Sequence, residues 1–111
     1  MDRLDNYRHI IENMLTEYAA VPHAYGEVED ETLFDRESDR YLVVSAGWDK
    51  KRRVYGVVIH IDIKHGKVWL QCNNTDRDIA QEMVEVGIAK EDIVLAFHPP
   101  EIRVHTGYAV A

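Results

Sequence analysis

The chain has 111 residues, of which 46% are hydrophobic and 30% charged, and it carries a net charge of −7. This length suits one domain, so we expect residues 1–111 to form a single domain around one core. No segment approaches the ~20 apolar residues of a membrane span, and the single cysteine, Cys72, excludes an internal disulfide and a cysteine-cluster zinc site. A chain that cannot form an internal disulfide suits a reducing compartment, so we predict a cytoplasmic protein. Because no segment is long and apolar enough to span a membrane, we expect no membrane association.

The charge is unevenly distributed along the chain. Residues 1–40 contain eleven acidic and four basic side chains, whereas residues 41–75 contain two acidic and six basic ones. Residues 76–111 are acidic again, with seven acids and three bases. An acidic protein repels the phosphate backbone, so general DNA binding is disfavoured and basic protein partners are favoured.

Residues 3–20 show the period of an amphipathic helix. The apolar stripe recurs at steps of three and four residues: Leu4, Tyr7, Ile11, Met14 and Tyr18. Asp2 or Asp5 suits the positive end of this helix. Pro22 should end the helix, because the residue before a proline is pushed out of the α region.

Residues 28–72 change to the pattern of strands joined by short polar turns. We expect four strands, at residues 28–35, 41–46, 54–63 and 68–72. The turns at residues 36–39, 49–52 and 64–67 are too short for anything but antiparallel neighbours. The sequence therefore predicts a four-stranded antiparallel β-meander.

A second helix follows the fourth strand. Thr75 is a candidate N-cap, with Asp78 completing a capping box, and Gly87 is suited to end the helix. Residues 93–97 are apolar and precede two prolines, which indicates a final strand or a buried extended segment. The order α-β-β-β-β-α-β predicts an α+β fold with two helices packed on one face of the sheet.

The predicted core joins both helices to the third strand. Its members come from these three elements: Ile11, Met14, Ile59, Ile61, Ile79 and Met83. Because side chains alternate along a strand, Val58 and His60 are expected on the opposite face from Ile59 and Ile61.

Few residues suggest catalysis. Asp62-Ile63-Lys64 follows an apolar strand and has the form of half a metal-dependent nuclease site, with Asp49 the nearest preceding acid. Three-residue motifs recur often by chance, so a solvated turn is the favoured interpretation. No two histidines have the spacing of a zinc-binding helix. We therefore predict that the protein is not an enzyme and has no catalytic, metal or cofactor-binding residues.

Two segments are poorly explained by folding. Lys50, Lys51, Arg52 and Arg53 form a basic turn preceded by Trp48, and either contact a partner or keep the turn soluble. After Phe97, the prolines of a second segment hold the backbone stiff, so that it either presents charge to a partner or connects elements. The predicted partner-binding residues are Trp48, Lys50, Lys51, Arg52, Arg53, His98, Glu101 and Arg103.

Three parts of the chain together resemble the XisI family, the fdxN-element excision controlling factors of cyanobacteria. They are residues 24–27 with 34–37, residues 47–54 leading into 59–63, and residues 87–88 followed by 93–103. The resemblance extends nearly from Met1 to Ala111. It implies an accessory role in the programmed excision of a DNA element from a nitrogen-fixation operon, in which a separate recombinase exchanges the strands. It also implies an XisH-like, nuclease-related partner, and it supplies no catalytic residues.

The resemblance and the residues leave several functions open. The favoured hypothesis is a non-catalytic controlling factor that binds the XisH-like partner and reaches DNA only through it. The alternative is an inhibitor, similar to an antitoxin, that masks a nuclease by charge complementarity. A small metal-dependent nuclease and a direct DNA binder are less favoured, and a homodimer is left open.

Overall fold

The computed structural model describes residues 2–24 and 26–111. Helix α1, Arg3–Ala20, has the predicted bounds. Asp2 is its N-cap and accepts a hydrogen bond from the Asp5 backbone amide at 2.8 Å, which satisfies one free donor of the first turn. Residues Tyr7, Ile11 and Leu15 are buried along one stripe, as the helical period predicts.

One five-stranded sheet forms the body of the molecule, in the spatial order β1-β2-β3-β4-β5. The strands are β1 Glu27–Asp35, β2 Arg40–Asp49, β3 Arg52–Lys64, β4 Lys67–Asn73 and β5 Ile93–Leu95. The first four are antiparallel neighbours, which confirms the predicted meander. Strand β5 pairs in parallel with β4, because the chain crosses over through a helix before returning to the sheet edge.

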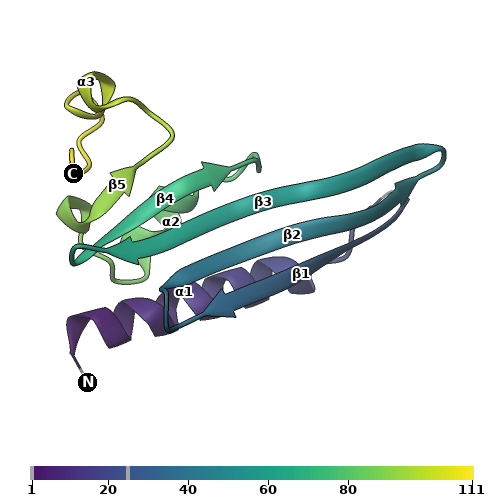
Figure 1. Ribbon diagram of the computed structural model, residues 1–111, viewed down its shortest axis with the longest axis horizontal. Helices are drawn as coiled ribbons and strands as arrows, with labels where there is room; N and C mark the ends of the chain where they lie inside the picture. Colours follow the sequence, from purple (N-terminus) through teal and green to yellow (C-terminus); the bar gives the residue numbers. More distant parts are fainter. Residues whose placement is uncertain (1, 25) are drawn as a thin grey trace.

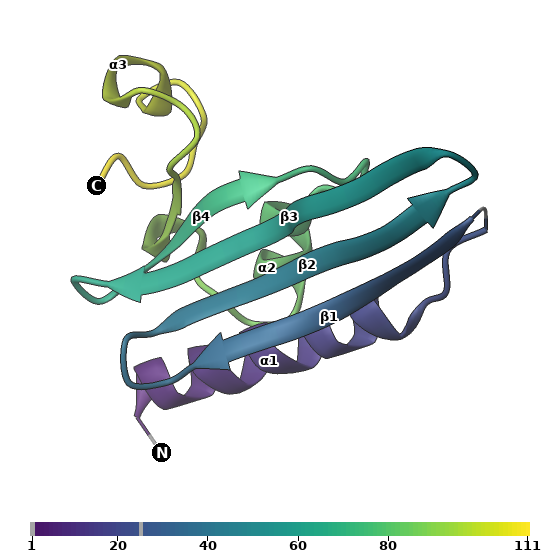
Figure 2. The ribbon, with the colours of Figure 1, turned by 45° about the vertical axis from the view of Figure 1, so that its right-hand side comes forward.

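Helices α1 and α2 lie on the same side of the sheet, as predicted for this α+β fold (Figures 1 and 2). Helix α2, Ile79–Glu85, is capped by Asp78, whose carboxylate accepts from the Gln81 amide at 3.1 Å. The prediction that Thr75 caps this helix is wrong. Its hydroxyl instead accepts from the Arg77 amide at 3.1 Å, which stabilises the turn before the helix.

Two short helical segments complete the chain. The 3-10 helix η1, Lys90–Asp92, leads into β5, and helix α3, Pro100–Arg103, follows it. Pro100 occupies the first turn of α3, where its missing amide hydrogen costs nothing. The predicted extended double-proline segment is therefore half correct, because Pro99 is extended and Pro100 begins a helical turn.

The predicted core is confirmed, with one member at its edge. Residues Ile11, Ile59, Ile61 and Met83 are fully buried, and Met14 is partly buried against them. The cluster as a whole joins α1, α2 and the sheet: Tyr7, Ile11, Leu15, Tyr41, Val43, Ile59, Ile61, Ile63, Val68, Leu70, Ile79, Ala80, Met83, Ile88, Ile93 and Leu95. The burial of this cluster is the main stabilising term of the fold.

The alternation of faces along β3 is interrupted at Val58. Val43 pairs with Ile59 and Val44 pairs with Val57, so Val58 is an extra residue in a β-bulge. It is half-buried and packs against the core rather than on the opposite face, so the prediction for Val58 is wrong. His60 does lie opposite Ile59 and Ile61, in register with Leu42.

The side of β1–β3 away from the helices is called the open face here. It carries apolar side chains from three neighbouring strands: Leu33, Leu42, Val44, Tyr55 and Val57. No helix covers this face in either view (Figures 1 and 2). At the β4–β5 edge, by contrast, Val94 is fully buried and the Arg103 guanidinium lies over the Trp69 ring, at 5.6 Å from its centroid.

A charged network ties α1 to the β1–β2 turn. Arg8 donates from Nε and Nη2 to the two carboxylate oxygens of Asp39, at 2.8 and 3.1 Å, and the Tyr41 hydroxyl donates to Asp39 at 2.9 Å. These hydrogen bonds, that of Arg8 above all, lower the pKa of Asp39. The network fixes the N-terminal half of α1 against the β1–β2 turn. Among the described residues, none of the helices combines the length and apolarity of a transmembrane helix.

Truncating a buried side chain should lower the free energy of unfolding much more than truncating an exposed one. Ile59→Ala removes a fully buried side chain, whereas Ile102→Ala makes the same change at a side chain that is 44% exposed. We expect Ile59→Ala to lower the free energy of unfolding by about 2–5 kcal/mol and Ile102→Ala to lower it by less than ~1 kcal/mol, measured by urea denaturation. Equal losses would contradict the core assigned here.

The Asp39 network should give a pH-dependent contribution to stability. Because the folded-state pKa lies below the unfolded value of about 3.9, the contribution is present above that value and is lost as the pH falls through the folded pKa. Asp39→Asn should therefore lower stability by about 1–2 kcal/mol at pH 7, and the difference from the native protein should shrink below about pH 4. Asparagine tolerates the positive φ of 54° at this position, so the substitution tests the charge.

Candidate functional site

The β2–β3 turn presents the predicted basic residues to solvent. Lys50 has a left-handed backbone, with φ of 57°, and reverses the chain directly before Lys51. Both lysines are exposed, while Arg52 forms an ion pair of 3.5 Å with Asp49 across the turn. We call residues 49–52 the tip. It projects from the far end of the β2–β3 hairpin, beyond the last residue of β4 (Figure 1).

Arg53 is held in place by two aromatic side chains next to the tip. Its guanidinium lies 5.4 Å from the centroid of the Trp48 ring and 5.6 Å from that of Tyr55, and it donates to the Gly47 carbonyl at 3.2 Å. Trp48 and Tyr55 remain 51% and 73% exposed. A rigid cluster of Trp, Tyr and Arg is typical of residues that dominate binding energy in interfaces.

Sequence reasoning missed Tyr55. A signal was present, because Tyr55 stands two residues after Arg53 on a strand and so shares its face. The cross-strand pairing of Arg53 with Trp48 then places all three side chains together on the open face.

The second predicted group lies in the C-terminal segment, residues 96–111. Glu101 is exposed, and the His98 ring is half-buried with its centroid 4.7 Å from that of Phe97. Arg103 is committed to the fold, because its guanidinium donates to four backbone carbonyls, those of Leu95, Ala96, His98 and Val110, at 2.8–3.3 Å. This arrangement satisfies acceptors that would otherwise be left open in an irregular segment.

The structure does not bring the two predicted groups together. The tip lies at one end of the sheet, and α3 lies at the other end in both views (Figures 1 and 2). One continuous surface containing both groups is therefore excluded. Two separate contact regions, the tip with Trp48 and Arg53, and the exposed part of α3 with Glu101, remain predictions.

The nuclease-like motif does not assemble. Asp62 accepts hydrogen bonds from Gln71 at 3.2 Å and lies 2.8 Å from the His60 ring nitrogen, while the Lys64 ammonium lies 4.1 Å from the centroid of the Trp69 ring. Asp49 is at the tip, nine residues along β2 from Arg40, which is the partner of Asp62. Among residues 2–24 and 26–111, no three His, Cys, Asp or Glu side chains are grouped as metal ligands would be.

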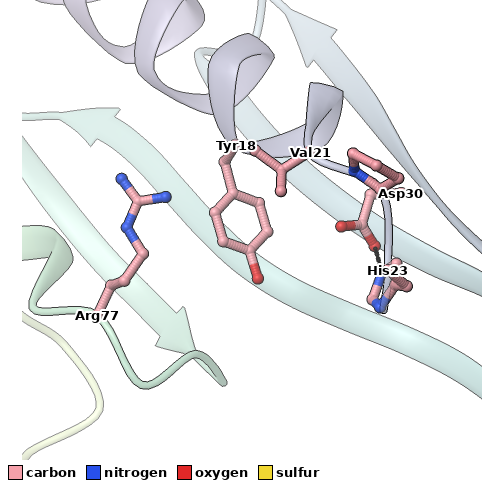
Figure 3. Close-up of a pocket in the computed structure, with 6 residues that line it drawn as sticks. Tyr18, Val21, His23, Asp30 and Arg77 are labelled. Carbon is pink, nitrogen blue, oxygen red and sulfur yellow. Dashed lines mark hydrogen bonds and ion pairs between the residues drawn. The ribbon is translucent and has the colours of Figure 1, made fainter. Parts of the chain in front are cut away.

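A cavity that sequence reasoning missed lies between the end of α1, β1 and the turn before α2. Its volume is about 220 Å³, and its polar lining includes Tyr18, His23, Asp30 and Arg77 (Figure 3). The side chain of Asp30 is only 4% exposed and lies 2.9 Å from a His23 ring nitrogen. The Tyr18 ring stands between Arg77 and the His23–Asp30 pair (Figure 3), and burial raises the pKa of Tyr18.

This cavity does not contain an activated serine nucleophile. The Ser45 hydroxyl donates to the same oxygen of Asp30 that faces His23, so Asp30 bridges the two side chains. In a catalytic triad the histidine must instead contact the serine hydroxyl to remove its proton. The arrangement positions a buried carboxylate between two hydrogen-bonding side chains and lacks the serine–histidine contact of a triad.

Comparison with known proteins places the chain in a family. A family model described as XisI protein matches residues 1–110. The chain belongs to the XisI family. The match spans the whole domain, which agrees with the full-length resemblance expected from the sequence.

Two solved structures support this assignment. A XisI-like protein from Anabaena variabilis ATCC 29413 is 41% identical, with a TM-score of 0.90, and the alignment covers 98% of this chain and 100% of that chain. The fdxN element excision controlling factor XisI from the same organism is 35% identical, with a TM-score of 0.83, over 99% of this chain and 100% of that chain. No curated protein sequence gives a significant match.

Arg103 should behave as a structural residue. Lysine cannot donate to four carbonyls at once, so Arg103→Lys should increase amide hydrogen exchange in residues 96–111 by about tenfold or more. Glu101→Gln, at the exposed neighbour in α3, is the control and should leave exchange unchanged. Unchanged protection in Arg103→Lys would contradict a structural role and favour a contact with a partner.

Proposed function

We propose that this XisI-family protein is a non-catalytic accessory factor that controls excision of a DNA element of the fdxN type. It acts by binding a nuclease-related partner of the XisH kind. The observation that carries the proposal is family membership over residues 1–110, together with a solved relative named as an excision controlling factor. Control of excision requires access to DNA, which fits action in the cytoplasm by a protein with one free cysteine.

The tip supports a protein contact rather than a general DNA contact. Its exposed bases, Lys50, Lys51 and Arg52, stand on a chain with a net charge of −7. A small positive patch on an acidic protein is repelled from an extended phosphate backbone but fits an acidic patch on a protein partner.

A second candidate function, inhibition of a nuclease, is favoured by one feature of β1. Glu27, Glu29 and Glu31 follow each other along one face of this edge strand, and all three are exposed. A row of carboxylates resembles the spacing of charge on nucleic acid and would complement the basic groove of a nuclease. The two functions differ in outcome: an inhibitor lowers the nuclease activity of the partner, whereas a controlling factor leaves it intact or directs it to the excision site.

Removing charge from the tip should weaken partner binding without affecting the fold. In the double variant Lys51→Ser with Arg52→Ser, capture of the XisH-like partner should weaken by about tenfold or more, while thermal stability changes by less than ~0.5 kcal/mol. The control is the double variant Arg40→Ser with Lys90→Ser, which removes two charges away from the tip. Affinity is measured by titration calorimetry.

Equal affinity of the two double variants for the XisH-like partner would contradict the tip as the contact surface. Failure of the native protein to bind the XisH-like partner would overturn the proposed mechanism. A reconstituted excision reaction, with and without the protein, tests the controlling role directly, and nuclease assays on the same samples separate control from inhibition.

A further inference from the structure

The open face consists of three side-by-side strips of side chains, one on each of β1, β2 and β3, and the strips differ in chemistry. On β1 the strip is acidic, with Glu27, Glu29 and Glu31. On β2 the strip is apolar, and it contains Leu42, Val44 and Ala46. On β3 the strip begins beside the tip with Arg53, Tyr55 and Val57, and it continues past the bulge with His60 and Asp62.

This face exposes more apolar surface than a solvated sheet needs. Tyr55 is 73% exposed, Leu33 55%, Trp48 51% and Val57 37%, and they lie on adjacent strands. Contiguous apolar surface bordered by charge usually marks an interaction site. The C-terminal segment covers the same side of the sheet only at β4–β5, where Trp69 and Val94 lie in register.

We propose that a second copy of this chain packs against the open face. The twofold axis runs parallel to the strands, over β2. Each copy then places its acidic β1 strip over the β3 strip of the other, and the two apolar β2 strips meet at the centre. A closed twofold interface requires a surface that is complementary to itself. In the part of the open face next to the tip, the acidic Glu27 on one side of the axis and the basic Arg53 on the other have that property.

The strand register fixes which charges meet. Glu27 pairs with Trp48, and Trp48 pairs with Arg53, so these three residues lie at one level along the strands. Rotation about an axis parallel to the strands preserves this level and brings Glu27 opposite the partner's Arg53. Symmetry makes this contact twice, and the Trp48 and Tyr55 rings already hold each guanidinium in place.

The other face-to-face arrangement is opposed by charge. With the axis across the strands, β1 would lie over β1 of the partner, so Glu27, Glu29 and Glu31 would meet the same carboxylates. Like charges brought together at an interface cost free energy and select against that arrangement. The parallel axis also places both basic tips at one end of the dimer, where their lysines are exposed and salt screens their mutual repulsion.

A charge swap tests the pairing. The native protein should be a dimer by analytical ultracentrifugation, and Glu27→Arg or Arg53→Glu alone should weaken dimerisation by about tenfold or more, because each change acts twice. The double variant with both substitutions should restore it. Glu37→Arg, in the exposed β1–β2 turn, is the matched control and should leave dimerisation unchanged.

Cross-linking tests the direction of the axis. In a Cys72→Ser background, cysteine is placed singly at positions 42, 44 and 46 of β2, and a short bis-maleimide is added because packed sheets lie about 10 Å apart. With the axis parallel to the strands, each position faces itself, so all three variants should form cross-linked dimers. A cysteine placed at Glu37 should not.

Three results would overturn the proposal: a native protein that is monomeric at all concentrations, a dimer insensitive to both single charge reversals, or a double variant that is not restored. Cross-linking at only one of the three β2 positions would contradict an axis parallel to the strands. With an axis across the strands, only one position would lie opposite the same position in the other copy. Partner capture by the tip variants is measured separately, so the proposed function can fail while this inference stands.

Discussion

Burial of one face of the sheet against two helices is the constraint on which this structure depends. The interior side chains of β2 and β3 meet α1 and α2 in a single cluster, at whose centre Ile11, Ile59 and Met83 are fully buried. A sheet covered on one side can keep the other side free only if polar groups make it soluble. Here charge lies along β1 and at the tip, and apolar side chains remain between them. The core therefore leaves one face of β1–β3 uncovered.

Irregular backbone in β3 allows one strand to serve two environments. The bulge at Val58 shifts the alternation, so Ile59, Ile61 and Ile63 face the core in the half of β3 that pairs with β4. The other half, from Arg52, extends past β4 with only β2 beside it and carries the exposed Tyr55. Bulges commonly redirect side chains near functional surfaces, and this one separates the half of β3 that packs in the core from the half that extends past β4.

Partly buried polar side chains in this protein fasten neighbouring elements to one another. Asp39 fastens α1 to the first hairpin, Arg103 holds the C-terminal segment through four carbonyls, and Asp30 bridges Ser45 and His23. Each is a satisfied hydrogen-bonding group, which specifies a single arrangement of neighbouring elements. A rigid body with defined contact regions is what a protein that works by binding requires.

The sequence by itself determined α1, the four-stranded meander and the core, because hydrophobic periods of 3.6 and 2 are local and leave a clear pattern. The family followed from the resemblance of three segments of the chain. It predicted α1 to the residue, and it selected the basic tip. Only the tertiary structure decided the parallel pairing of β5, the shift at Val58 and the structural role of Arg103, since each depends on contacts between distant segments. Likewise, the separation of the tip from α3 follows from the length of the hairpin and the path of the crossover, which no local pattern encodes.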